Sequence, residues 1–329
     1  MSKKILTAGI DIGGTKIQAV ILEKGFRVTG RGRRLSGNEK PDLTQADLLE
    51  SVMGALRAAC SKAGKNIKEL AAIGVGCAGQ VEARTGDVLD PPNFKWDRIP
   101  VRSMIERSTE KPVTIVNDVQ AAAWGEFSLG AGGGATNMVC IFVGTGIGSG
   151  IIINGELYRG SAGCAGEVGH THFKTNGAPC QCGQKGCAEA YAGGRNLCLR
   201  AGRAIRRGTK SRITDLVDGN LDHIPANVIY KAAKEGDPLA KRLWRDAELA
   251  IGAVCHNYVD LLNPDILVLG GGILDGIPQL RDFARSYVKK RAVPTAVKAV
   301  KIVAPKLGKL SAAVGAAELA YRNVLNDNR

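Results

Sequence analysis

Aromatic residues are scarce in this chain, at 5% of its 329 residues. They do not interleave with the basic residues, although the formal net charge is +14 at pH 7. Surfaces that bind single-stranded nucleic acids usually combine basic residues with aromatic side chains on which the bases stack. We therefore expect no nucleic-acid partner, and the positive charge is compatible with attraction of a small polyanion.

Long hydrophobic runs are also missing. No apolar stretch reaches the roughly 18 residues that a membrane-spanning helix needs, so we expect no membrane insertion. The first residues pass directly into a strand-like pattern without the features of a signal peptide. The nine cysteines are odd in number, and three of them cluster between Cys180 and Cys187. This usage predicts metal binding in a reducing, cytoplasmic compartment and not a disulfide framework.

A Walker A motif is absent, which excludes a P-loop nucleotide site. Two other glycine-rich segments each follow a strand-like run, at residues 11–16 and 144–150. Glycines allow backbone N–H groups to point at a phosphate, and a threonine adds a hydroxyl donor. The residues concerned are Asp11, Gly13, Gly14, Thr15 and Lys16 in the first segment, and Thr145 and Gly146 in the second. We predict two phosphate loops, with Mg²⁺ held by Asp11 through water. A plain hairpin turn is the alternative for the first segment.

The two loops belong to similar stretches of chain. Strand, glycine-rich loop, strand and tight turn follow one another in residues 5–30 and again from residue 138, with Lys24-Gly25 and Asn154-Gly155 as hairpin turns. Further strands are expected at 71–76, 113–116 and 265–269, and helices at 44–63, 119–127, 197–262 and 311–325. Alternating strands and helices favour an α/β protein. The repeat suggests two similar domains, each presenting a loop to a shared cleft.

Two shorter motifs lie between these loops. Residues 74–79 match G-x-G-x-x-G, but residues 80–92 look like a hairpin and not a helix, so a dinucleotide site is disfavoured. We interpret these glycines instead as part of a loop that faces a sugar. Asn117-Asp118 lies between a strand and a helix, where a carboxylate is favoured in the ionised form that abstracts a proton. A helix cap is the alternative for this dipeptide.

The strongest local signal is the Cys-rich segment, in which Cys180, Cys182 and Cys187 lie within eight residues and are separated by glycines. Three thiolates at this spacing suit one tetrahedral zinc ion, and His170 or His172 would supply the fourth ligand. Such a site would be structural, and redox-active cysteines are the alternative. Nearby Glu167 and Glu189 are candidates for binding sugar hydroxyls, although surface salt bridges would explain them equally well.

These motifs occur in the order and spacing of one family, and the chain resembles the ROK sugar kinases and repressors. The matching segments are 11–16, 117–118, 166–170, 180–189, 270–272 and 314–317. The resemblance implies the two-domain, actin-like, hexokinase-type (ribonuclease H-like) ATPase fold, with a cleft between the domains. Residues 1–119, completed by the C-terminal helix 311–329, would form the small domain. Residues 120–310 would form the large domain that contains the Cys-rich segment.

The resemblance also implies roles for individual residues. Asp118 would be the general base on the sugar 6-hydroxyl. The sugar would be bound by Gly79, Asn93, Asn117, Asp118, Glu167, His170 and Glu189. Zinc would be bound by His170, Cys180, Cys182 and Cys187, with His170 in both sets. The ATP phosphates would lie against the two glycine-rich loops, and Gly271 and Gly272 would lie against the adenosine.

The implied activity is ATP-dependent phosphorylation of glucose at the 6-hydroxyl. Pro91–Trp96 is similar to the Pro-Asn-x-x-Trp segment of bacterial glucokinases in the family. Ala78 and Val119-Gln120 depart from the usual residues beside the sugar, so a kinase for N-acetylglucosamine or N-acetylmannosamine is the alternative. A sugar-sensing repressor would need a DNA-binding domain ahead of Asp11, and we expect none. Polyphosphate is an alternative donor that the net charge would suit. The family resemblance also implies a homodimer or homotetramer.

Overall fold

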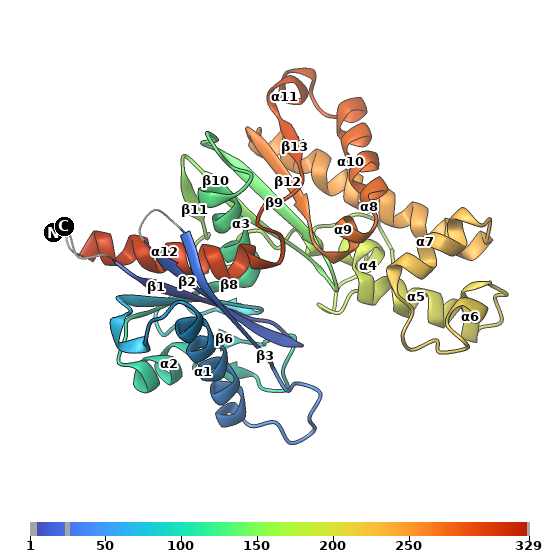
Figure 1. Cartoon of the computed structure of the whole chain (residues 1–329). Coiled ribbons are helices and arrows are strands. Elements are labelled where there is room, and N and C mark those ends of the chain that lie inside the picture. Colours follow the sequence, from blue (N-terminus) through green and yellow to red (C-terminus); the bar gives the residue numbers. More distant parts are fainter. Residues whose placement is uncertain (1–4, 24–26, 328–329) are drawn as a thin grey trace. The chain divides into compact units, whose positions relative to one another are not determined.

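The computed structural model describes residues 5–23 and 27–327, which alternate between strands and helices (Figure 1). The first sheet has the order β3-β2-β1-β4-β8. Its strands are β1 (Thr7–Ile12), β2 (Lys16–Glu23), β3 (Arg27–Leu35), β4 (Ala72–Cys77) and β8 (Val113–Asn117). The first three strands pair antiparallel, whereas β4 and β8 continue the sheet in parallel with β1. The predicted Lys24-Gly25 turn lies outside the described residues.

The second sheet repeats the beginning of the first. Its order is β11-β10-β9-β12-β13. The strands are β9 (Met138–Val143), β10 (Ile147–Ile153), β11 (Glu156–Tyr158), β12 (Ile266–Gly270) and β13 (Lys301–Val303). Asn154 and Gly155 connect β10 to β11 with φ angles of 52° and 78°, the two positive values that a type I′ hairpin turn needs. The predicted Asn-Gly hairpin is therefore confirmed.

A third, small antiparallel sheet contains β5 (Gln80–Val81), β6 (Val88–Leu89) and β7 (Arg98–Ile99). A hairpin therefore follows the G-x-G-x-x-G match, as predicted. No helix begins there, so the dinucleotide interpretation lacks the helix that it requires.

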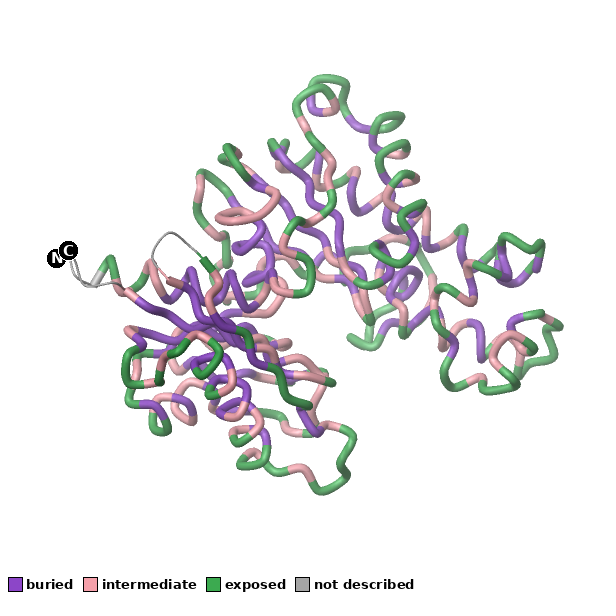
Figure 2. The backbone as a smooth tube through the Cα atoms, in the orientation of Figure 1, coloured by how far each residue is buried: buried purple, intermediate pink, exposed green. Residues whose placement is uncertain are grey.

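Strands β1, β4, β9 and β12 are buried over nearly their whole length (Figure 2). The helices pack against the sheets and against one another. They are α1 (Gln45–Lys62), α2 (Val101–Thr109), α3 (Asp118–Leu129), α4 (Glu189–Ala192), α5 (Gly194–Arg206), α6 (Ile213–Leu216), α7 (Ala226–Lys234), α8 (Pro238–Leu262), α9 (Gly272–Gly276), α10 (Pro278–Arg291), α11 (Pro294–Ala299) and α12 (Ser311–Asp327). Short 3₁₀ turns occur at Ile67–Glu69, Val168–His170 and Gly308–Leu310. The sequence of α1 shows why an α-helix forms there. Thr44 and Asp47 form a capping box at its start, and Leu48, Val52 and Leu56 recur at helical spacing on its buried side. Among the described residues, no helix is both long enough and apolar enough to cross a membrane.

The chain divides into two compact units. Unit 1 takes the described residues within 1–136, 150–166 and 305–329, and unit 2 takes 137–149 and 167–304. Unit 1 therefore contains the first sheet together with the last helix. The domain limits expected from the sequence, 1–119 with 311–329 and 120–310, stay a prediction.

Within unit 1, helix α12 lies directly against the backbone of its neighbours. It contacts β1, β4 and α3. A Cβ atom on Gly9 would overlap the carbonyl oxygen of Ala313, one on Gly74 would overlap that of Ala316, and one on Gly315 would overlap that of Ala121. Glycine and alanine thus allow α12 to approach the sheet and α3 more closely than larger residues would.

Gly315→Ala is expected to destabilise unit 1. The added methyl group has no room beside the α3 backbone, so α12 must shift, and we expect a loss of about 3 kcal/mol in the free energy of unfolding. Urea unfolding followed by circular dichroism measures this loss. Gly133→Ala is the matched control, because nothing lies within 4 Å of the Cβ position there. Equal midpoints for the two variants would contradict the close packing.

The start of α12 is fixed by a buried carboxylate. Glu126 of α3 is fully buried, and its two oxygens accept hydrogen bonds from the backbone N–H groups of Lys306 and Leu307, both at 2.8 Å, and from the hydroxyl of Ser311 at 2.7 Å. A buried carboxylate is stable only when such donors replace water. Glu126 therefore ties the segment before α12 to α3.

Candidate functional site

The Asn117-Asp118 pair lies where β8 ends and α3 begins. Asn117 is the N-cap of α3, because its Oδ1 accepts hydrogen bonds from the N–H groups of Val119 at 2.9 Å and Gln120 at 3.2 Å. Its Nδ2 donates to the carbonyl oxygen of Gly79 at 3.2 Å, which joins two of the predicted sugar-binding residues. Asn117 is therefore the N-cap, and Oδ1 of Asp118 also accepts a hydrogen bond from the N–H of Val119 at 2.9 Å. Asp118 is the first residue of the helix, where the helix dipole favours an ionised carboxylate.

Asp11, near the end of β1, is electrostatically coupled to Asp118. The pKa of the Asp11 carboxyl is raised to about 7, first by burial and next by the negative charge of Asp118, against the lowering effects of a hydrogen bond from Gln18 and the charge of Lys16. Two carboxylates that repel each other offer oxygen ligands of the kind that Mg²⁺ prefers. The residues present therefore fit a magnesium ion.

Asp11→Asn is expected to increase stability at alkaline pH. The folded-state pKa of Asp11 lies above its unfolded value, so folding favours the protonated form and stability falls as pH rises from about 4 to about 7. The neutral amide removes this penalty, and the variant should exceed the parent by on the order of 2–4 kcal/mol at pH 8, with little difference below pH 4. Urea unfolding without Mg²⁺ or nucleotide measures the difference. Asp42→Asn, at an exposed position, is the control, and parallel pH profiles for parent and Asp11→Asn would contradict the prediction.

The first glycine-rich loop joins β1 to β2 in unit 1. The N–H of Gly13 donates to the carbonyl oxygen of Lys16 at 3.1 Å, and Ser36 donates from its hydroxyl to the carbonyl oxygen of Gly14. A Cβ atom on Gly14 would lie 2.8 Å from the side chain of Asn93, so the predicted phosphate loop and a predicted sugar-binding residue are in contact. The structure therefore gathers the predicted residues of unit 1 around the ends of β1, β4 and β8.

The second glycine-rich loop, between β9 and β10, belongs to unit 2. The N–H of Gly144 donates to the carbonyl oxygen of Gly146 at 2.9 Å. The N–H of Arg195 donates to the carbonyl oxygen of Thr145 at 3.1 Å. Glu189 accepts a hydrogen bond at its Oε2 from the N–H of Ile147, at 2.7 Å. The sequence analysis missed this support of the loop by Glu189. The signal for it was the Gly193-Gly194 pair, whose second residue donates to the carbonyl oxygen of Gly144 at 2.9 Å.

Gly271 and Gly272 connect β12 to α9, also in unit 2. Gly271 has a φ of 96°, and a Cβ atom there would lie 2.6 Å from the backbone of Val143. Both observations explain why glycine is needed at this position. The Cβ position of Gly272 has nothing within 4 Å, so this part of the backbone is open to a ligand.

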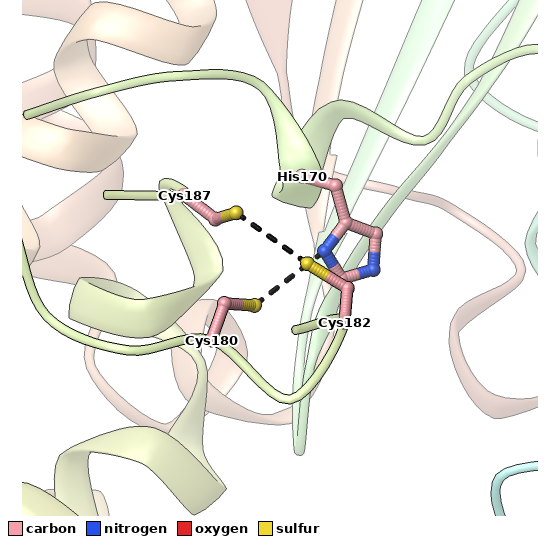
Figure 3. Close-up of side chains that lie close together, drawn as sticks. All are labelled: His170, Cys180, Cys182 and Cys187. Carbon is pink, nitrogen blue, oxygen red and sulfur yellow. Dashed lines mark hydrogen bonds between the residues drawn. The ribbon is translucent and has the colours of Figure 1, made fainter. Parts of the chain in front are cut away.

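The Cys-rich segment forms a compact cluster with His170 (Figure 3). The Sγ atoms of Cys182 and Cys187 lie 3.6 Å apart, and the Sγ of Cys180 lies 3.6 Å from Nδ1 of His170. Zn–S bonds of about 2.3 Å and Zn–N bonds of about 2.1 Å place the ligand atoms of a tetrahedral site about 3.6 to 3.8 Å apart. These residues therefore fit zinc. The Nε2 of His172 instead lies 3.2 Å from the hydroxyl of Thr175, outside the cluster.

The three thiols of the cluster differ in pKa. Burial, together with the neighbouring thiols, raises the pKa of Cys187 to about 12, and burial also raises the pKa of Cys180. The pKa of Cys182 is lowered, because burial, which would raise it, is outweighed by hydrogen bonds from the backbone N–H of Gln184 and from the neighbouring thiols. Thiolates crowded in this way are unfavourable unless a positive ion lies among them, and metal binding would release their protons.

The second ring nitrogen of His170 faces a carboxylate. Its Nε2 lies 4.0 Å from Oε2 of Glu167, while Nδ1 faces the thiols. A histidine that binds a metal through one nitrogen is commonly oriented by a carboxylate or ligand at the other. Glu189 begins α4 two residues after Cys187, so the cluster of His170 with the three cysteines and the second glycine-rich loop are connected through one short segment of unit 2.

Two α/β units, each with a glycine-rich loop after its first sheet strand, define a protein of the actin-like, hexokinase-type ATPase fold. Solved structures agree with this class. The ROK hexokinase from Thermus thermophilus superposes with a TM-score of 0.78 at 30% identity, over 98% of this chain and 100% of that one. The ROK family glucokinase from Streptomyces griseus, in complex with glucose and AMPPNP, superposes with a TM-score of 0.76 at 33% identity, over 96% and 99%.

The sequence comparisons identify the family. The ROK family model matches residues 7–323, and the chain belongs to the ROK family, as the motifs predicted. A glucokinase from Streptomyces coelicolor is 36% identical over 319 residues, which are 96% of this chain and 97% of that protein. An N-acetylmannosamine kinase from Vibrio cholerae is 32% identical over 268 residues, 81% and 84% of the two chains.

Proposed function

We propose that this protein is a sugar kinase that transfers the terminal phosphoryl group of ATP to the 6-hydroxyl of glucose. The observation that carries the proposal is Asp118, which stands at the start of α3 beside a separate capping residue. Support comes from the glucokinase of Streptomyces griseus, whose structure contains glucose and an ATP analogue. The glucokinase of Streptomyces coelicolor, 36% identical, supports the same substrate.

In the proposed reaction, Asp118 accepts the proton of the sugar 6-hydroxyl as that oxygen attacks the terminal phosphorus of ATP. The bond from this phosphorus to the bridging oxygen breaks, and ADP leaves. Asn117, Gly79 and Asn93 of unit 1, and Glu167, His170 and Glu189 of unit 2, are assigned to the sugar. Fixed amide and carboxylate groups of this kind orient the reacting hydroxyl.

The phosphates of ATP are assigned to Gly13, Gly14, Thr15 and Lys16 of unit 1 and to Thr145 and Gly146 of unit 2. Asp11 would hold Mg²⁺, which supplies positive charge against the phosphate oxygens. The open backbone at Gly272, next to Gly271, suits the adenosine. Burial of Asp11 beside Asp118 supports the magnesium assignment, because a divalent cation would relieve the repulsion between them.

We further propose that His170, Cys180, Cys182 and Cys187 hold a structural zinc ion. Four protein ligands leave no open coordination position for chemistry. The zinc would fix the ring of His170, with its Nε2 beside Glu167, and would anchor Glu189 at the start of α4. Its contribution would therefore be to hold sugar-binding groups in place.

A substrate panel tests the proposal. ATP turnover is measured with glucose, mannose, fructose, glucosamine, N-acetylglucosamine and N-acetylmannosamine, each over a concentration series. We expect kcat/KM for glucose to exceed that of every other sugar by at least about tenfold. A preference for an acetylated sugar would favour the second candidate, which the Vibrio cholerae relative supports. Absence of turnover with all six sugars would overturn the kinase assignment.

A further inference from the structure

Unit 1 contains a cavity whose lining includes none of the residues assigned above to the sugar or to ATP. Its volume is about 220 Å³, and it lies along β8, the edge strand of the first sheet. The wall is formed by residues 113–116 of β8, with Arg102 from α2, Arg159 from the segment after β11 and Asn323 from α12. Helix α2, strand β8 and helix α12 can be followed in Figure 1. The cavity therefore brings the consecutive elements α2 and β8 together with two segments that are distant in the sequence, around Arg159 and Asn323.

The lining is positively charged. Arg102 and Arg159 both contribute to it, and the described residues that line the cavity include no aspartate or glutamate. Arg159 is exposed as a residue, yet the protein atoms around its guanidinium lower its pKa through desolvation alone, with no contribution from an acidic neighbour. No acidic side chain among the described residues of the lining balances the two guanidinium charges, so an anion in the cavity would be attracted by both.

The side chain of Arg102 is held in place at the cavity wall. Its Nη1 donates to the carbonyl oxygen of Arg84 at 3.1 Å. Its Nε is enclosed by protein beside Gly86 and is not accessible to a ligand, so the contribution of Arg102 to the cavity is the positive charge of its guanidinium. The planar guanidinium of Arg159 presents its donors in a geometry that matches carboxylate and phosphate oxygens.

The walls of the cavity are held rigid by hydrogen bonds. Gln120 is buried and donates from Nε2 to the carbonyl oxygens of Gly163 at 3.0 Å and Ala165 at 3.1 Å, which fixes the segment that carries Arg159. Asn323 donates from Nδ2 to the hydroxyl of Thr114 at 2.8 Å. The site is thus built before a ligand binds, which reduces the entropic cost of binding.

We propose that this cavity is a binding site for a small phosphate-bearing anion, either inorganic phosphate or a phosphate monoester such as a hexose phosphate. Two arginines provide the charge, and Arg159 the paired donors, for a dianion. The volume exceeds that of a single water many times over, since a water occupies roughly 30 Å³ in the liquid, so the site has room for more than a bare halide ion. The site is distinct from the two glycine-rich loops and does not depend on the proposed kinase activity.

Calorimetric titration of the full chain tests the proposal, with inorganic phosphate in one arm and glucose 6-phosphate in the other. Glucose, Mg²⁺ and a non-hydrolysable ATP analogue are present in excess, so that the proposed active site does not contribute. We expect saturable binding of at least one ligand, weakened by about tenfold or more in Arg159→Gln. Arg107→Gln, at an exposed position of α2, is the control and should bind as the parent does.

The two titrations distinguish the ligands. If only inorganic phosphate or only glucose 6-phosphate binds, that compound is the ligand of the site. Arg102→Gln should abolish binding, but Arg102 packs against Gly86 and this variant can fail to fold. Arg159→Gln, at an exposed position, therefore carries the test. No saturable binding of either ligand up to about 10 mM, or equal affinities for Arg159→Gln and Arg107→Gln, would overturn the proposal. The comparison of these variants stays decisive if the kinase assignment fails.

Discussion

Asp118→Asn is expected to lower kcat by roughly 10²–10⁴-fold, with little change in KM for the sugar, because the amide cannot accept a proton from the 6-hydroxyl. The fold should survive, since the cap of α3 is Asn117 and not Asp118. Steady-state kinetics measures the loss, and glucose binding followed by calorimetry shows whether the sugar site persists. A loss confined to kcat would separate proton transfer from sugar binding.

The control for this experiment is Asp42→Asn, which makes the same chemical change at an exposed position. It should retain the kcat of the parent. If Asp118→Asn kept kcat within about tenfold of the parent, another group would have to be the base. If the variant had a normal kcat and a raised KM, Asp118 would bind the sugar and would not be the group that accepts the proton.

Loss of the proposed zinc ion is expected to have a second large effect. Cys187→Ser removes one of the buried thiols proposed to bind it, and we expect zinc content to fall from one equivalent to near zero and kcat/KM to fall by about 100-fold or more. The reason is local, because Glu189 follows Cys187 closely and bonds the N–H of Ile147 in the second glycine-rich loop. Loosening the segment would release both the loop and the histidine ring beside Glu167.

Elemental analysis of the purified protein and thermal unfolding measure the metal and its contribution to stability. Cys164→Ser is the matched control, because Cys164 is an exposed thiol outside the cluster. It should leave zinc content, melting temperature and activity unchanged. A parent protein that is fully active with no bound zinc would contradict the structural role.

Local motifs made much of the fold predictable. Asn154-Gly155 predicted its hairpin because the positive φ angles of that turn strongly favour these two residues. The spacing of Cys180, Cys182 and Cys187 predicted a cluster because short loops force neighbouring thiols together. In each case the feature is determined by a few consecutive residues, and contacts with distant residues do not change it.

The features of the site that the sequence did not predict depend on contacts between residues that are distant in the chain. Spacing alone left His170 and His172 as equal candidates, and the difference is the direction of each ring. The bond from Ile147 to Glu189 joins residues on either side of the Cys-rich segment, and the Gly193-Gly194 pair is only an indirect sign of it. Arg102 and Arg159 likewise come from different elements, so their shared cavity is visible only once unit 1 has folded.

The close packing of α12 against glycines also has a consequence for synthesis of the chain. Strands β1 and β4 are translated early, but the helix that covers Gly9 and Gly74 is translated after residue 310. Until α12 leaves the ribosome, the nascent chain exposes a face of this sheet that only the late helix can cover, and such surfaces attract chaperones or other unfinished chains. The part of the protein that is made first should therefore complete its folding last.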